Sequence, residues 1–246
     1  MKTPVLIVML FCITSITSCT KESAVSSSNA AGSGKAGSLA RFAIVGDYLY
    51  TLDGSDIVSY DITTGNNPLF KNRVKVGFDI ETIYPYNNML FIGSQTGMYA
   101  YELTNAAMPK LLSVVRHVRS CDPVVVQGNY AYVTLRGGTR CGGSNVLNVY
   151  DVTNLSSPAL IKTININAPF GLGVNGTALY ITNPDGIKLF NIAQPGNPVF
   201  VKDIADANAS DVIPFNNTLI VQLRKGASFY DISNSMNPIF QSRITQ

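Results

Sequence analysis

The sequence lacks the residues on which most enzymes depend: it has no tryptophan, a single histidine (His117), and only 13% charged residues among 246. One histidine leaves no room for most Ser-His or Cys-His catalytic schemes. The net charge of +3 is too small and too scattered for nucleic-acid binding, and no motif of aromatic and basic residues supports it. Since no window has helical periodicity, no helix can follow a Gly-rich phosphate loop. The familiar catalytic and nucleotide-binding constellations are therefore absent from the sequence.

The first 18 residues have the features of a bacterial signal peptide. Lys2 supplies the positive charge, and Val5 to Ile13 is an apolar run too short to span a bilayer. The ending Ile16-Thr17-Ser18-Cys19 resembles the lipobox of bacterial lipoproteins. This resemblance implies cleavage before Cys19 and acylation of that cysteine, and Thr20 in place of aspartate is consistent with the outer membrane. The alternative is an ordinary secretory signal with an incidental cysteine.

Residues 19–40 continue with serine, alanine, glycine and lysine and contain almost nothing to bury. This composition predicts a flexible tether without secondary structure. A random coil of this length reaches about 25 Å, which would hold the following domain clear of lipid headgroups.

Cys121 and Cys141 form the pair of cysteines that remains within the domain. In an oxidising compartment their simplest state is a disulfide. Two free thiols, or a metal site that includes His117, are the alternatives, although a zinc ion would still lack a fourth ligand.

A short pattern recurs five times along the chain: an aromatic residue, an acid or amide and a branched apolar residue, with proline eight positions after the aromatic. The copies are Tyr60-Asp61-Ile62 with Pro68, Tyr101-Glu102-Leu103 with Pro109, Tyr150-Asp151-Val152 with Pro158, Phe190-Asn191-Ile192 with Pro198, and Tyr230-Asp231-Ile232 with Pro238. The aromatic residues are 41, 49, 40 and 40 positions apart. A period near 40 in strand-forming residues predicts a repeat architecture.

Each repeat contains four short extended runs separated by turn residues. In the second repeat they are Ile80 to Tyr86, Met89 to Ser94, Gly97 to Leu103 and Lys110 to His117. This arrangement predicts a four-stranded antiparallel meander. The second run of each repeat is mostly apolar on both faces, so both faces must be covered, as they are where sheets stack radially.

The apolar second strand, the aromatic-Asp-Ile strand end and the Asn-x-x-x-Pro turn together resemble the LVIVD repeat of bacterial β-propeller lipoproteins. The segments that carry the resemblance are Tyr48 to Asp53, Asn154 to Pro158, Ser120 to Pro123 and Thr139 to Gly143. The resemblance implies an all-β propeller over residues 41–246. Counting the repeats gives five blades at about 41–78, 79–120, 121–169, 170–209 and 210–246, and we expect the ring to close by packing of blade 1 on blade 5. The resemblance implies no particular activity. A β-sandwich is the architectural alternative, but it gives no reason for a regular period.

The acids of the repeated pattern are expected to accept hydrogen bonds from the following turn, since each stands at a strand end. Other acids precede the innermost strands, which would line an axial channel. These candidates for a channel-mouth ligand site are Asp79, Glu81, Asp122 and Asp211. Converging carboxylates could hold a cation such as calcium, or a polar ligand. The alternative is a set of solvated acids.

The third repeat is the longest, with eight or nine extra residues between Leu135 and Leu147. Long loops on rigid scaffolds often carry recognition, and Cys121 could join this loop to the start of its own blade. The candidate anion-binding residues are Arg116, Arg119, Arg136 and Arg140, close in sequence to His117. Arginines suit carboxylates or phosphates. The alternative is an exposed loop with solvated charges.

The sequence thus predicts a β-propeller tethered by lipid in the bacterial envelope, at the outer membrane. We expect it to act as a binding or assembly module for an envelope protein or glycan. We predict no catalytic residues and no cofactor, apart from the calcium ion that the channel-mouth acids could hold. The alternative is a metal-dependent hydrolase or lyase that uses the channel-mouth carboxylates. Retention of calcium would favour the enzyme, whereas co-purification of a protein or glycan would favour the binding module.

Overall fold

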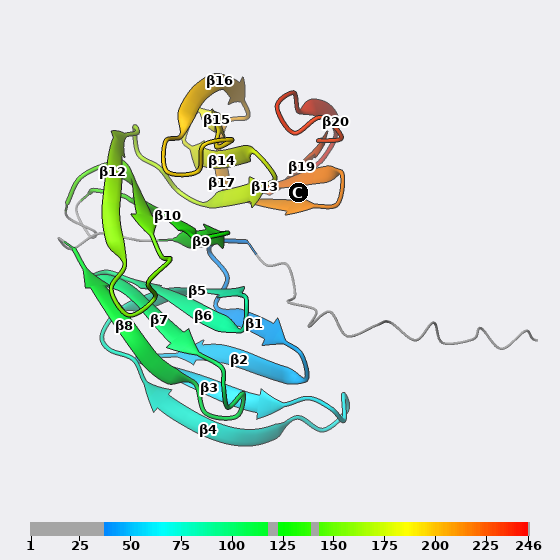
Figure 1. Cartoon of the computed structure of the whole chain (residues 1–246). Coiled ribbons are helices and arrows are strands. Elements are labelled where there is room, and N and C mark those ends of the chain that lie inside the picture. Colours follow the sequence, from blue (N-terminus) through cyan, green and yellow to red (C-terminus); the bar gives the residue numbers. More distant parts are fainter. Residues whose placement is uncertain (1–36, 118–122, 139–142, 246) are drawn as a thin grey trace, which may run out of the picture. The chain divides into compact units, whose positions relative to one another are not determined.

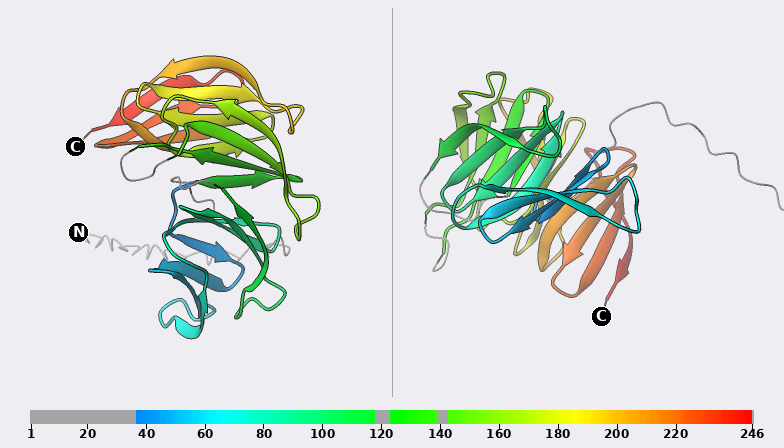
Figure 2. Two further views of the ribbon diagram at one scale, coloured as in Figure 1. Left: turned by 90° about the vertical axis from the view of Figure 1, so that its left-hand side faces the viewer. Right: turned by 90° about the horizontal axis from the view of Figure 1, so that it is seen from below.

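The computed structural model describes residues 37–117, 123–138 and 143–245. These residues form five sheets of four antiparallel strands, each a simple meander, and the fold is a five-bladed β-propeller (Figures 1 and 2). The fold class predicted from the 40-residue period is therefore confirmed. Cys19, Asp122, Arg119, Arg140, Cys121 and Cys141 lie outside the described residues.

The strands of each blade follow the chain from the innermost to the outermost position. Blade 1 contains β1 (Phe42–Val45), β2 (Tyr48–Asp53), β3 (Asp56–Asp61) and β4 (Leu69–Lys75). Blade 2 contains β5 (Ile80–Tyr86), β6 (Met89–Ser94), β7 (Gly97–Glu102) and β8 (Lys110–Arg116). Blade 3 contains β9 (Val124–Gln127), β10 (Tyr130–Leu135), β11 (Val146–Asp151) and β12 (Ala159–Asn165). Blade 4 contains β13 (Leu172–Asn175), β14 (Ala178–Asn183), β15 (Gly186–Asn191) and β16 (Val199–Ala205). Blade 5 contains β17 (Ala209–Phe215), β18 (Thr218–Leu223), β19 (Gly226–Asp231) and β20 (Ile239–Ile244).

The repeated pattern builds the corner between the third and fourth strands. Asp61 Oδ1 accepts hydrogen bonds from the hydroxyl and the amide of Thr63, at 2.6 and 3.0 Å. These two bonds, with Lys71 nearby, lower the pKa of Asp61 to about 2. Asp151, Asn191 and Asp231 accept the equivalent amide bond. The predicted turn-fixing role of this position is confirmed at these four residues.

Every outer strand starts directly after the repeated proline, where a missing N–H costs nothing. Each outer strand also has a β-bulge opposite the repeated aromatic residue, which leaves one outer residue unpaired. Bulges of this kind bend an edge strand and limit its pairing with other chains. The bulge residues are Lys71, Leu112, Ile161, Val201 and Gln241.

The hydrophobic core is divided among the junctions between successive blades. Four clusters of buried residues occur in the described part of the chain, one each between blades 1 and 2, 2 and 3, 3 and 4, and 4 and 5. Strands β6 and β14 are buried along their whole length. The prediction that second strands are covered on both faces is therefore confirmed for these interior blades.

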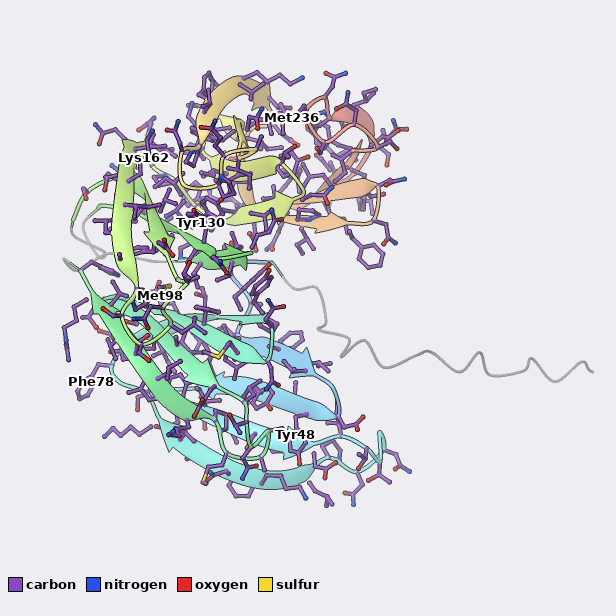
Figure 3. All side chains as sticks on the ribbon, viewed as in Figure 1. Tyr48, Phe78, Met98, Tyr130, Lys162 and Met236 are labelled. Atoms are coloured by element: carbon purple, nitrogen blue, oxygen red, sulfur yellow. The ribbon has the colours of Figure 1, made fainter. Side chains whose placement is uncertain are left out.

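Polar side chains also connect the blades, because they form hydrogen bonds to the turn of the next blade. Three tyrosine hydroxyls donate to backbone carbonyls there: Tyr50 to Ala106 at 2.7 Å, Tyr132 to Pro195 at 3.0 Å, and Tyr180 to Ser235 at 2.7 Å. On outer strand β12, Lys162 (Figure 3) donates to the side chain of Asn197 in blade 4. Such contacts fix the rotation of each blade against the next.

Candidate functional site

The structure describes three of the four carboxylates predicted to form a channel-mouth site, because Asp122 lies outside the described residues. Asp79 is exposed and adopts a positive φ of 54°, whereas Glu81 accepts a 3.0 Å hydrogen bond from the side chain of Gln95. Asp211 is buried, with 2% of its surface exposed. No cluster of three or more acids, cysteines or histidines able to hold a metal ion occurs among the described residues.

Asp211, at the start of β17, binds the segment that leads into blade 1. Its Oδ1 accepts a 2.9 Å hydrogen bond from the Ser38 hydroxyl, and its Oδ2 accepts a 3.1 Å bond from the Leu39 amide. The Ser38 oxygen in turn accepts a 2.7 Å bond from the amide of Leu172 in blade 4. Through Asp211 and Ser38, the entering chain is tied to two blades that are distant in sequence.

Residues 37–40 were expected to belong to the flexible tether, and that part of the expectation is wrong. Ser38 is only 1% exposed, and the carbonyl of Ala40 accepts a 2.9 Å bond from the amide of Ile83 on β5. The composition of this segment is that of a linker, but its small residues are what allow it to pass between blades. A Cβ at Gly37 would come within 2.2 Å of the Asp211 carboxylate.

The pocket around Asp211 predicts a distinctive dependence of stability on pH. Burial raises the pKa of Asp211 to about 6, although the bonds from Leu39 and Ser38 oppose the shift. The folded chain therefore retains this proton over a pH range in which the unfolded chain has lost it. Its contribution to stability is complete below about pH 4 and is lost as the pH rises through about 6.

We expect Asp211→Asn to remove this dependence. The free energy of unfolding of the wild-type chain, minus that of the variant, should fall by on the order of 2 kcal/mol between pH 4 and pH 7. Urea unfolding of both chains at several pH values measures this difference. The contributions of the other carboxylates are the same in both chains and cancel. Parallel pH curves for the two chains would show that Asp211 does not titrate as described.

A pocket of about 260 Å³ lies where the second halves of four innermost strands meet, in blades 2 to 5. It is lined by Tyr84, Pro85, Tyr86, Val125, Val126, Gln127, Leu172, Gly173, Val174, Asn175, Gly176, Val212 and Pro214. A Cβ at Gly173 would lie 2.7 Å from the Pro214 ring, so glycine is required for β13 and β17 to approach here. We call this cavity the axial pocket.

The axial pocket has polar groups but no charged side chain. The Tyr86 hydroxyl accepts a 2.6 Å bond from the Gly128 amide, and the Gln127 side chain donates a 2.7 Å bond to the carbonyl of Gly176. Burial, with a smaller contribution from Tyr86, raises the pKa of Tyr84 to about 12. At neutral pH the Tyr84 hydroxyl is therefore a neutral hydrogen-bond donor.

Prolines reduce the number of backbone donors that face this pocket. The amides of Ile83 on β5 and Leu172 on β13 bond to Ala40 and Ser38. They therefore point away from the neighbouring strands β6 and β14. Because the direction of the backbone N–H alternates along a strand, the positions two residues further on, Pro85 and Val174, have their nitrogens on the same side. Pro85 has no N–H to leave unpaired, whereas Val174 keeps a donor toward the pocket.

The predicted anion-binding arginines are only partly described. Arg116 is exposed at the end of β8, and the Arg136 guanidinium lies 4.7 Å from the centre of the Phe170 ring. This cation–π contact ties Arg136 to the start of blade 4. The structure does not bring these two arginines together in any described contact.

Sequence reasoning missed the axial pocket and the partner of Asp211. The tyrosines of the pocket belong to an ordinary first strand, and their local pattern resembles that of core residues. A usable signal was the proline within two first strands, Pro85 and Pro214, because proline is tolerated only at an unpaired edge.

No protein-family model matches the chain, and no curated protein matches its sequence. Solved structures share its fold. A functionally unknown protein from Desulfotomaculum acetoxidans is 15% identical with a TM-score of 0.65, and the match covers 81% of this chain and 68% of that one. The periplasmic gluconolactonase PpgL of Pseudomonas aeruginosa is 12% identical with a TM-score of 0.64, over 81% and 68% of the two chains.

BamB from Moraxella catarrhalis is 12% identical with a TM-score of 0.57, and the match covers 79% of this chain and 55% of that one. At these identities the likeness shows the propeller fold alone. In the part of the chain that the structure describes, no helix is long and apolar enough to cross a membrane.

Proposed function

We propose that this propeller is a binding module of the bacterial envelope that takes an uncharged polar ligand, of the size of a simple sugar, in the axial pocket. The observation that carries the proposal is the composition of the pocket, which has two tyrosines and two carboxamides but no charged residue. A charged ligand would lose its hydration there without gaining a counter-charge, which is costly. An uncharged ligand avoids this cost.

Sugars suit the groups that line the pocket. Tyrosine rings present apolar surfaces to the C–H faces of a sugar ring, and their hydroxyls can bond to its oxygens. The side chains of Gln127 and Asn175 provide both donors and acceptors. The volume of about 260 Å³ lies just below the usual range for small-molecule pockets, which favours one ring over a chain of rings. A gluconolactonase, named for a sugar lactone, is among the proteins with this fold.

The membrane attachment belongs to the same proposal. Cys19 would carry the lipid, and the chain would enter the propeller at residues 37–39, where Asp211 fixes it. The bond between Cys121 and Cys141 and the arginine patch remain proposals for the third-repeat loop. Assembly with an envelope protein is compatible with this attachment. The described carboxylates give no support to the hydrolase or lyase alternative, since no three of them converge.

Ligand-observed NMR and titration calorimetry with the lipid-free mature chain test the pocket. The probes are D-glucose and N-acetylglucosamine, with glucose 6-phosphate as the charged counterpart. We expect at least one uncharged sugar to bind, and the phosphate ester to bind at least tenfold more weakly. Asn175→Ala should weaken sugar binding about fivefold, because a buried hydrogen bond contributes about 1 kcal/mol.

Asn66→Ala is the matched control, since Asn66 is exposed in a turn of blade 1 and does not line the pocket. It should leave sugar binding unchanged. Binding of glucose 6-phosphate at least as tight as that of glucose would contradict an uncharged ligand. Failure of both sugars to bind, or equal effects of the two asparagine variants, would also overturn the assignment.

A further inference from the structure

The four inner junctions bury one row of side chains on the face that each blade turns toward the next. The second-strand members of this row are Tyr50, Phe91, Tyr132 and Tyr180, each at most 1% exposed. The third-strand members Ile57, Met98, Leu147 and Ile187 are equally well buried. Each junction therefore excludes nearly all solvent from these positions.

The same row in blade 5 is not covered. Ile220 and Phe229 are paired neighbours on β18 and β19, and both are partly exposed, as is Ala227, while Gln222 is exposed. The neighbouring residues Leu219 and Val221 point to the opposite face and pack against blade 4. We call the row Ile220, Gln222, Ala227 and Phe229 the free face of blade 5.

Blade 1 has the complementary free face. Leu49, Thr51 and Tyr60 are partly exposed, although their equivalents Leu90, Ile92 and Tyr101 in blade 2 are at most 1% exposed. Only Val58 of this row is buried. At the inner rim, Phe42 of blade 1 and Phe215 of blade 5 are 56% and 51% exposed.

Among the described residues, the tyrosine contacts found at three of the four other junctions have no counterpart here. Ile220 occupies the position from which Tyr50, Tyr132 and Tyr180 reach the next turn, and it has no hydroxyl to donate. The corresponding turn of blade 1 is exposed, and a Cβ at Gly65 would meet no atom within 4 Å. Among the described residues, Ser38 and Leu39 both donate hydrogen bonds to Asp211 of blade 5, whereas no strand of blade 1 does.

We propose that the free face of blade 5 binds the free face of blade 1 in a second copy of this chain. The two faces are the halves of an interface that the molecule already forms four times, so each matches the other in side-chain spacing and apolar character. A second copy of this chain carries both faces and therefore offers that match. The contact is head-to-tail, and two copies related by a twofold axis would form it twice.

The four existing junctions indicate where such a contact can be cross-linked. Ala227 is equivalent to Ile57, Met98, Leu147 and Ile187, and Thr51 is equivalent to Ile92, Val133, Ile181 and Val221. At every junction the two equivalents belong to the same hydrophobic cluster. Cysteines at Ala227 and Thr51 of different copies would therefore face each other across about 10 Å, the spacing of packed sheets, which a short bifunctional thiol reagent can span. Both positions are partly exposed.

The experiment uses the full chain, expressed in a bacterial envelope as two tagged variants, Thr51→Cys and Ala227→Cys. Treating cells that contain both with a short bis-methanethiosulfonate reagent, which links two thiols through reducible disulfides, should give a band at twice the monomer mass that carries both tags. Either variant alone, or Ala227→Cys together with Val201→Cys on the exposed outer strand β16, should give no more of this band than the parent chain. Reduction should abolish it.

The double variant Thr51→Cys with Ala227→Cys in one chain tests the competing arrangement. If the two free faces of one chain close on each other, this variant forms a monomer of increased gel mobility, the mixed single variants form no dimer, and the proposal is overturned. Absence of both products also overturns it, because neither face is then covered by this chain. Unchanged levels of each variant on reducing gels confirm that both fold.

Discussion

Replacing Asp206 by alanine is expected to lower the free energy of unfolding by about 3 kcal/mol. The Asp206 carboxylate follows outer strand β16 of blade 4 but is buried against blade 5. It accepts hydrogen bonds from Tyr230 at 2.8 Å and Ser228 at 3.3 Å, and it pairs with Arg243 at 2.6 Å. The alanine variant leaves two buried hydroxyls without this acceptor and a cation without its partner.

The expected loss lies at the lower end of the range for broken buried ion pairs, because the Arg243 side chain is 41% exposed and can turn to water. Asp203→Ala is the matched control, in strand β16, which Asp206 follows. Asp203 pairs with Lys188 at 2.7 Å, but its side chain is 61% exposed, so the loss should stay below about 1 kcal/mol. Urea unfolding of both variants at pH 7 measures the difference, and equal losses would contradict the assigned role of Asp206.

The positions of the strands could be predicted because they depend on residues that are close together in the sequence. Turn residues and proline mark each strand end, and β-branched and aromatic residues fill the runs between them. In blade 2 the expected strands Ile80 to Tyr86 and Met89 to Ser94 match β5 and β6. The repeat then determined the blade count without any knowledge of tertiary contacts.

Burial in the terminal blades could not be predicted in the same way. The second strand of blade 1 contains Tyr48-Leu49-Tyr50, with the same apolar character as its interior equivalents. A strand sequence specifies what a face is made of, whereas its coverage depends on whether another blade lies beside it. The expectation that blade 1 packs on blade 5 treated all junctions as equivalent, but the exposed members of both free faces show that this junction differs.

The candidate site was only partly accessible for a related reason. Asp211 was predicted as a channel-mouth ligand residue, but it binds the chain itself. Its partner Ser38 lies 173 positions away in a segment with the composition of a linker. Hydrogen bonds of that range leave no periodic trace in the sequence. The pocket residues Tyr84 and Tyr86 likewise become a site only when four first strands meet around one axis.

The central claim is that successive blades bury equivalent side chains at four junctions and leave the free faces of blades 1 and 5 open within one chain. Leucine occupies one such position in four blades, as Leu49, Leu90, Leu179 and Leu219. Leu179 is fully buried between blades 3 and 4, whereas Leu49 is partly exposed on the free face of blade 1. The same substitution at these two sites therefore compares a closed junction with an open face.

The deciding measurement is urea unfolding of Leu179→Ala and Leu49→Ala at a protein concentration where the chain is monomeric. Leu179→Ala should cost about 3 to 4 kcal/mol, because it removes buried methyl groups and leaves a cavity. Leu49→Ala should cost about 1 kcal/mol, because its side chain keeps part of its contact with water and its surroundings can relax. Equal losses at the two positions would show that blade 1 is sealed like the other blades, and would contradict an open junction between blades 1 and 5.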